Sequence, residues 1–248
     1  MEYATLNTGA RMPMLGFGVF QVTDLMQCKQ IVLDAIDVGY RLFDTAAVYG
    51  NEAAVGEAIA EAIAMGKVKR EDLFITSKLW VQDMNAYDVD EGIDQSLRNL
   101  GLEYIDLYLL HQAMGDYFSA WRGLEQAYRD GRLMDIGVSN FYPNVLTNFC
   151  ENVDIKPAVN QIELHPYFQQ PDALDTMKYY DVLPEAWAPL GGGRYSPFEE
   201  KLLQDIAETH DKTVGQVVLR WNIQRGVVVI PKTCLLYTSP SPRDTERS

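Results

Sequence analysis

The sequence predicts one α/β domain of the (β/α)8 or TIM-barrel class. Three observations predict it. Short runs of β-branched or aromatic residues alternate with longer helical patterns along nearly the whole chain, eight such runs are present, and reactive polar residues follow several of them. Alternation of this kind indicates repeated βα units around a parallel sheet. At 248 residues the chain is long enough for one large core.

The elements can be assigned in order along the chain. We expect strands at 14–17, 41–44, 73–77, 105–110, 135–138, 158–162, 183–188 and 227–231. Between them apolar residues recur at helical spacing, so that each helix can cover a pair of strands. These faces are Cys28, Val32, Ala35 and Ile36; Val55, Ile59 and Ile63; Val89, Ile93, Leu97 and Leu100; and Val214, Val218 and Trp221. Glycines favoured in a left-handed C-cap follow three helices, at Gly39, Gly101 and Gly131.

An open, doubly wound sheet would give the same alternation, so spacing alone leaves both folds open. The placement of polar residues favours the barrel, because the C-terminal ends of all barrel strands meet at one mouth. These residues are Asp44, Lys78, His111, Ser139, Asn140, Gln161 and Glu163. The G-x-G-x-x-G turn that usually follows the first strand of an open dinucleotide-binding sheet is missing.

Charge and cysteine content narrow the class of partner. The net charge of -14 argues against nucleic acid, because an acidic field repels a phosphate backbone. A dinucleotide is still possible, since it needs only a local basic pocket and a few backbone donors. The three cysteines lack the spacing of a disulfide framework or a zinc site, so we expect no metal and a reducing cytoplasm. We expect no membrane segment, because no apolar run approaches about eighteen residues.

Five motifs follow one another along the chain. They are GYRLFDTAAVYGNE at 39–52, FITSKLW at 74–80, DLYLLH at 106–111, GVSNF at 137–141 and VNQ at 159–161. In this order they resemble the signatures of the aldo-keto reductases, in particular the bacterial 2,5-diketo-D-gluconate reductase type, from about Thr5 to Thr233. The family has a (β/α)8 barrel, and its members transfer hydride from a nicotinamide to an aldehyde or ketone. The resemblance therefore implies an NAD(P)H-dependent carbonyl reductase.

Four residues carry the implied chemistry: Asp44, Tyr49, Lys78 and His111. Reduction places negative charge on the carbonyl oxygen, so the site needs an acid beside that atom. The resemblance assigns this role to Tyr49, whose ordinary pKa of about 10 the ammonium of Lys78 would lower. Asp44 would keep Lys78 charged, and His111 would donate a hydrogen bond that orients the substrate. Singly, each could be a helix cap, a packed side chain or a surface charge, but together they favour catalysis.

The resemblance also implies a cofactor, NADPH in preference to NADH. The implied contacts are Ser139, Asn140, Gln161, Trp187, Ala188, Pro189, Leu190, Lys232 and Thr233. The first three would hydrogen-bond the nicotinamide carboxamide, and Trp187 would stack on the ring, unless it is simply packed in the core. Lys232 and Thr233 would meet the phosphate on the adenosine ribose.

The substrate pocket is implied by Phe20, Trp80 and His111, which match apolar or orienting positions near the reacting carbonyl. Such a pocket suits hydrophobic or aromatic aldehydes and ketones. Many relatives have Trp-Pro after the histidine, whereas this chain has Gln112 and Ala113, so one wall of the pocket differs. We expect a monomer whose only partner is this small molecule.

The resemblance stops at Thr233, which divides the chain into a barrel at 1–233 and a tail at 234–248. The adenosine clamp, last helix and C-terminal loop of the family have no counterpart, so we expect a barrel without them. The tail contains two prolines and no helical period. It resembles a translated sequencing adapter, artefactual or disordered, with a short divergent terminus as the alternative.

Two other functions are compatible with such a barrel. The chain could be a catalytically silent binding protein or an inactive fragment, although all four catalytic positions are filled. It could also be an aldolase that forms a Schiff base through Lys78. The presence of Tyr49 and Trp187 argues against the aldolase, because a Schiff base needs neither an aligned phenol nor a ring that stacks on nicotinamide.

Overall fold

The computed structural model describes residues 1–232. Its main sheet has eight parallel strands in the order β10-β9-β8-β7-β6-β5-β4-β3. Their bounds are β3 (Gly16–Gly18), β4 (Leu42–Asp44), β5 (Phe74–Leu79), β6 (Ile105–Leu110), β7 (Leu133–Ser139), β8 (Val159–Glu163), β9 (Leu183–Trp187) and β10 (Val228–Val229). Leu15 pairs in parallel with Val229, and the Gly18 N–H donates to the Pro231 carbonyl at 3.1 Å. These contacts close the sheet, so the predicted barrel is confirmed and the open sheet is wrong.

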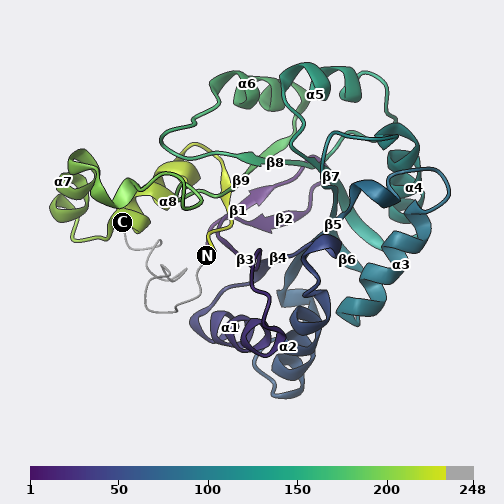
Figure 1. The fold of residues 1–248 in the computed structure, drawn as a ribbon, viewed down its shortest axis with the longest axis horizontal. Helices are drawn as coiled ribbons and strands as arrows, with labels where there is room; N and C mark the ends of the chain where they lie inside the picture. The colour runs from purple at the N-terminus through teal and green to yellow at the C-terminus, as the bar shows by residue number, and fades with distance from the viewer. Residues whose placement is uncertain (233–248) are drawn as a thin grey trace.

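Helices surround the strands in Figure 1. They are α1 (Leu25–Val38), α2 (Glu52–Ala64), α3 (Val89–Leu100), α4 (Tyr117–Arg129), α5 (Pro143–Cys150), α6 (Pro171–Tyr180), α7 (Lys201–Thr209) and α8 (Val214–Gln224). One α-helix lies between each pair of consecutive barrel strands from β3 to β9, and two lie between β9 and β10. Thr233 and the predicted tail at 234–248 lie outside the described residues. In the part that is described, every helix is too short or too polar to cross a membrane.

Local sequence explains where the helices begin and end. The Asp24 side chain accepts from the Gln27 N–H and caps α1, whose C-cap Gly39 has a φ of 107°. Such a left-handed backbone is favourable for glycine, which has no Cβ.

The prediction that Ile63 belongs to the buried face of α2 was wrong, because Ile63 is 36% exposed. Instead, α2 buries small residues, and a Cβ on its Gly56 would lie 2.2 Å from the Leu100 carbonyl oxygen at the end of α3.

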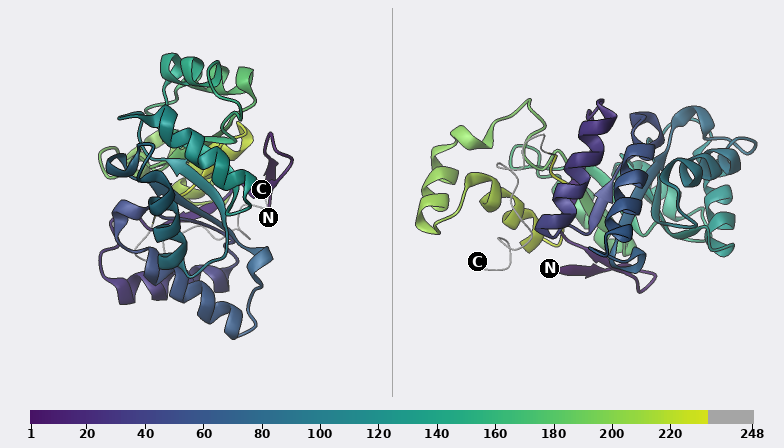
Figure 2. Two further views of the ribbon diagram at one scale, coloured as in Figure 1. Left: turned by 90° about the vertical axis from the view of Figure 1, so that its right-hand side faces the viewer. Right: turned by 90° about the horizontal axis from the view of Figure 1, so that it is seen from below.

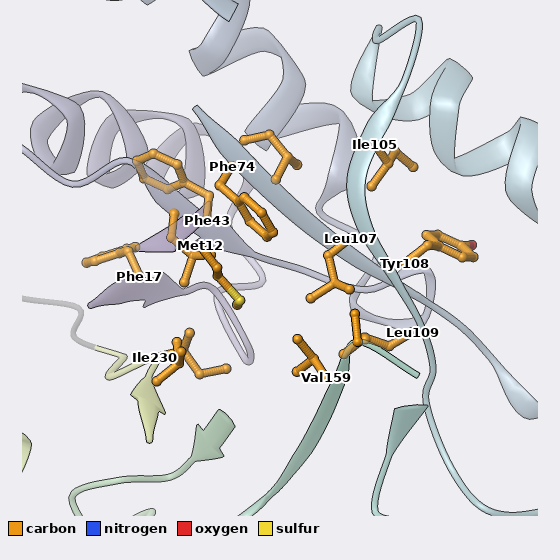
Figure 3. Packing of buried hydrophobic residues seen from close by; sticks show 14 of the residues in the cluster. Met12, Phe17, Phe43, Phe74, Ile105, Leu107, Tyr108, Leu109, Val159 and Ile230 are labelled. Atoms are coloured by element: carbon orange, nitrogen blue, oxygen red, sulfur yellow. The ribbon is translucent and has the colours of Figure 1, made fainter. Parts of the chain in front are cut away.

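A hairpin that the sequence did not predict covers the N-terminal end of the barrel. It pairs β1 (Tyr3–Thr5) with β2 (Arg11–Pro13) and lies at one end of the molecule in Figure 2. Met12 is fully buried, and in Figure 3 it lies among interior side chains that include Leu107, Val159 and Ile230. Because the hairpin and these apolar side chains seal this end, the opposite end is left for polar residues.

Candidate active site

The catalytic residues predicted from the sequence meet at the C-terminal ends of neighbouring strands. Asp44 is the last residue of β4, Lys78 is next to last in β5, and His111 directly follows β6. Tyr49 ends a short 3-10 helix, Ala47–Tyr49, in the connection from β4 to α2. Strand ends therefore position three of the four side chains, and a loop positions the fourth.

Asp44 and Lys78 form a buried ion pair. The Lys78 Nζ donates to Asp44 Oδ1 at 2.6 Å and to the Thr45 carbonyl at 2.8 Å. The side chains of Lys78 and Asp44 are 0% and 3% exposed. Burial by itself lowers the pKa of Lys78, but the charge of Asp44 acts in the opposite direction, and the pKa lies above its ordinary value. Lys78 is therefore a fixed positive charge in the site.

Tyr49 lies beside this charge, with the Lys78 Nζ 5.1 Å from the centre of its ring. Burial of the phenol raises the pKa of Tyr49, and the charge of Lys78 lowers it. The net pKa is above the ordinary value, whereas the sequence led us to expect it below. The sequence shows the nearby cation, which lowers the pKa, but it does not show the loss of water around the phenol. That loss disfavours phenolate and has the larger effect. Tyr49 therefore holds its proton at neutral pH.

His111 faces Tyr49, with their ring centres 5.6 Å apart. Burial, followed by the charge of Lys78, lowers the pKa of His111 to about 3. Its Nδ1 is buried and has no hydrogen-bond partner among residues 1–232. The imidazole is therefore neutral and carries a single N–H, which makes it a hydrogen-bond donor rather than an acid.

Aromatic side chains surround these two residues. The Phe20 ring centre lies 4.9 Å from that of Tyr49, and the Trp80 ring centre lies 5.0 Å from that of His111. Phe20 is 52% exposed. The structure thus brings Phe20 and Trp80 to the catalytic group, with Gln112 following His111 on the same connection.

The residues predicted to hold the nicotinamide form a second, adjoining group. The Ser139 hydroxyl donates to the Gln161 carbonyl at 2.9 Å. The Asn140 amide donates to the His111 carbonyl at 3.2 Å, and the Trp187 indole N–H donates to Asn140 Oδ1 at 2.9 Å. The half-buried Trp187 ring is therefore fixed at the end of β9 and joined to the connection that carries His111.

The segment after Trp187 has a left-handed backbone at several positions. Ala188 has a φ of 50°, and Gly191 has a φ of 88°. A Cβ on Gly191 would lie 2.4 Å from the Tyr195 carbonyl oxygen, so only glycine fits there. Pro189 is buried and Leu190 half-buried, beneath this turn. The glycine-lined loop and the fixed indole fit a nicotinamide dinucleotide.

Three further predicted residues have other surroundings. Lys232 is exposed beyond β10, next to the segment that pairs with β3, and Thr233 lies outside the described residues. Glu163, at the end of β8, is the register partner of Trp187, and its Oε1 lies 3.3 Å from the Nε2 of the buried His165.

Sequence reasoning gave no role to Asn51, although it belongs to the quoted motif. Its Oδ1 accepts from the Thr45 hydroxyl at 2.7 Å. Its Nδ2 donates to the carbonyls of Val19 and Val22, at 3.0 and 3.2 Å. Asn51 therefore joins the loop of Phe20 to the connection that carries Tyr49. Its position directly before a helix was the available signal, and that signal normally indicates a cap.

Glu185 is a second residue to which the sequence gave no role. It is 0% exposed on β9, two residues before Trp187, and shares a hydrogen-bond donor with Asp44. A buried carboxyl group without its own cation is unusual, because desolvating a charge is costly.

Comparison with known proteins identifies the family of the chain. The model of the aldo/keto reductase family matches residues 14–236. The chain belongs to the aldo/keto reductase family. Three predictions are thereby confirmed: the enzyme class, the (β/α)8 barrel and NADPH as the cofactor.

Relatives of this aldo/keto reductase cover nearly all of it. It is 45% identical to an uncharacterized oxidoreductase of Bacillus subtilis, over 93% of this chain and 82% of that protein. It is 44% identical to the glyoxal reductase of the same organism, over 92% of this chain and 81% of that protein. The crystal structure of a Bombyx mori aldo-keto reductase in complex with NADP superposes with a TM-score of 0.94, at 34% identity, covering 100% of this chain and 88% of that one.

Proposed function

We propose that this protein reduces aldehydes and ketones to alcohols with hydride from NADPH, and that Tyr49 is the proton donor. One observation carries the proposal. A phenol that holds its proton lies between a buried ammonium, Lys78, and a neutral imidazole, His111. This arrangement presents one acid and one hydrogen-bond donor to the same carbonyl oxygen.

Each of the four side chains has its own role at that oxygen. NADPH, when bound, supplies the hydride to the carbonyl carbon. Tyr49 gives its proton to the oxygen, and the Lys78 ammonium stabilises the phenolate that is left. Asp44 holds the ammonium in place at 2.6 Å. Because the pKa of His111 is lowered to about 3, the ring orients the substrate through its N–H without competing as an acid.

The same cluster supports a binding mode for the cofactor. Ser139, Asn140 and Gln161 would hold the carboxamide of the nicotinamide, and Trp187 would stack on its ring. Backbone amides of the loop from Ala188 to Gly193 would approach the pyrophosphate. Lys232 and Thr233 would meet the phosphate on the adenosine ribose, which favours NADPH over NADH.

Two observations bear on the substrate. The rings of Phe20, Trp80, Tyr49 and His111 support apolar and aromatic carbonyl compounds. The relative named glyoxal reductase supports small 2-oxoaldehydes. We propose the small 2-oxoaldehydes as the preferred class, because this relative is 44% identical over 92% of the chain.

The test follows the loss of NADPH absorbance with glyoxal, methylglyoxal and benzaldehyde. In Tyr49→Phe we expect kcat to fall by at least about 100-fold, because general acid catalysis contributes that much or more. The Kd for NADPH, from quenching of tryptophan fluorescence, should change less than about threefold. Tyr179→Phe is the matched control, because Tyr179 is 80% exposed on α6 and should keep full activity.

The other two functions predict different results. NADPH binding without turnover of any carbonyl compound would indicate a silent binding protein. Covalent trapping of a ketone on Lys78 by borohydride, without cofactor, would indicate a Schiff-base aldolase.

The predicted cytoplasmic location and monomeric state stay predictions. Fractionation of cells and the solution mass of the protein would test them.

A further inference from the structure

Glu185 lies on β9 and is linked to Asp44 of the predicted catalytic group by the Gln161 side chain. It pairs in register with Gln161 on β8, and it lies on the same side of β9 as Trp187, because side chains alternate along a strand. The Gln161 Nε2 donates to Glu185 Oε2 and to Asp44 Oδ2, each at 2.9 Å. One amide group therefore bridges two carboxyl groups that come from different sides of the barrel.

The charges around Glu185 are unbalanced. Lys78, from β5, is already paired with Asp44, from β4, at 2.6 Å. The charge of Glu185 also affects the pKa of Tyr49. On the two flanking strands, its register partners are Gln161 and Val228, and neither carries a charge. The Oε1 of Glu185 is buried and has no partner within the described part of the chain. Burial, and then the nearby charge of Asp44, raise the pKa of Glu185 to about 8.

We propose that Glu185 is a positioning residue of this active site, a second acidic group that is held beside Asp44 by the Gln161 amide and acts on Tyr49 and Lys78 through its charge. The inference rests on the proposed function, because it concerns the acid of that reaction. At neutral pH the carboxyl group is protonated, and Lys78 is balanced by Asp44 alone.

The effect on Tyr49 has a definite sign. When Glu185 ionises, its negative charge raises the pKa of Tyr49, because it disfavours a second negative charge nearby. Tyr49 then keeps its proton to a higher pH than it would beside a neutral group. Reduction needs the phenol, and alcohol oxidation needs the phenolate. Both pH profiles therefore depend on Glu185, and in the same direction.

The variant Glu185→Gln tests this effect. Its side chain has the same shape and still offers an oxygen to the Gln161 amide, but it cannot ionise. We expect the alkaline limb of kcat/KM for reduction and the acidic limb for alcohol oxidation to move together to lower pH. The shift should be about one pH unit, as for unit charges roughly 10 Å apart in a protein interior.

Asp135→Asn is the matched control. Asp135 is also a buried carboxyl group, 1% exposed, but it lies at the hairpin end of the barrel, where Thr8 donates to it at 2.6 Å. Its substitution should leave both limbs where they are in the wild type. A purely structural role for Glu185 would instead lower kcat by the same factor at every pH in Glu185→Gln, without moving either limb, and that result would overturn the proposal.

A second measurement does not depend on turnover. In protein labelled with 13C at the glutamate carboxyl carbons, NMR should show one resonance that titrates near pH 8 and is missing from Glu185→Gln. If every glutamate titrates below pH 6, Glu185 is ionised at neutral pH and the proposed protonated state is wrong. If the wild type reduces no carbonyl compound, the proposed function fails, and the titration alone decides the state of Glu185.

Discussion

Asp44→Asn is the sharpest perturbation of this site, because it removes one charge and almost no volume. The Asp44 and Lys78 charges are 2.6 Å apart and both side chains are nearly inaccessible to water. At an effective dielectric constant of about 20, charges at this distance attract by about 6 kcal/mol. The desolvation of both groups offsets part of that energy. Removal of one partner from a buried pair costs about 3–5 kcal/mol, and we expect this loss in the free energy of unfolding at pH 7.

Urea denaturation followed by circular dichroism measures that loss. Asp37→Asn is the matched control, because Asp37 pairs with Lys67 at 2.7 Å, but the two side chains are 50% and 34% exposed. With the distance nearly equal and only the burial different, the control should lose less than about 1 kcal/mol. The double variant Asp44→Asn with Lys78→Met should lose less than the sum of the single variants, since it leaves no unpaired charge.

The pH dependence gives a further check on the same pair. The pKa of Lys78 is higher in the folded protein than its ordinary value of 10.5. Its contribution to stability is therefore fully present below that pH and is lost as the pH rises through the folded pKa. The reasoning is refuted if Asp44→Asn loses no more stability than Asp37→Asn, because Lys78 would then not be a buried cation that needs a partner.

Three further outcomes follow from the geometry. Trp187→Ala should weaken NADPH binding about tenfold, because an aromatic stack contributes about 1 kcal/mol or slightly more. A fluorescence titration measures the Kd, and a change below twofold would contradict the stacking role. The pKa of Asp135 is raised to about 6, so stability is lost as the pH rises from about 4 to 6, and Asp135→Asn should flatten this slope in urea titrations. Because the pKa of His111 is lowered to about 3, kcat/KM for reduction should show no inflection near 6.5; an inflection there that His111→Asn removes would be evidence against a neutral imidazole.

Most of the barrel could be predicted from the sequence because its strands and helices have strong local patterns. The predicted strand at 105–110 coincides with β6, and the others overlap the observed strands. The hairpin of β1 and β2 could not be predicted in the same way, because it precedes the alternation of strands and helices on which the prediction rested. Ile63 was misassigned because α2 packs through alanines close to the end of α3, and periodicity does not show which side of a mostly apolar helix is buried.

The grouping of the four predicted residues could be foreseen from the sequence, but their electrostatics could not. The motifs named Asp44, Tyr49, Lys78 and His111, and the structure brings them together at one mouth. The net direction of the pKa shift of Tyr49 depends on how much water the folded protein removes from its phenol. That quantity is set by Phe20, His111 and other side chains from separate loops, so the nearby cation alone predicted the wrong direction.

The hydrogen bond between Gln161 and Asp44 shows why Glu185 could not be connected to the active site from sequence. Asp44 is on β4 and Gln161 is on β8, with three strands between them in the sheet order. Four inter-strand steps of about 4.8 Å would separate them by roughly 19 Å in a flat sheet, which is far beyond the reach of a glutamine. Closure turns the two strands toward each other across the barrel, and the bond forms at 2.9 Å. The bridge to Glu185 is therefore a consequence of ring closure, and a substitution that opened the barrel between β3 and β10 should uncouple Glu185 from Tyr49 even with every catalytic side chain present.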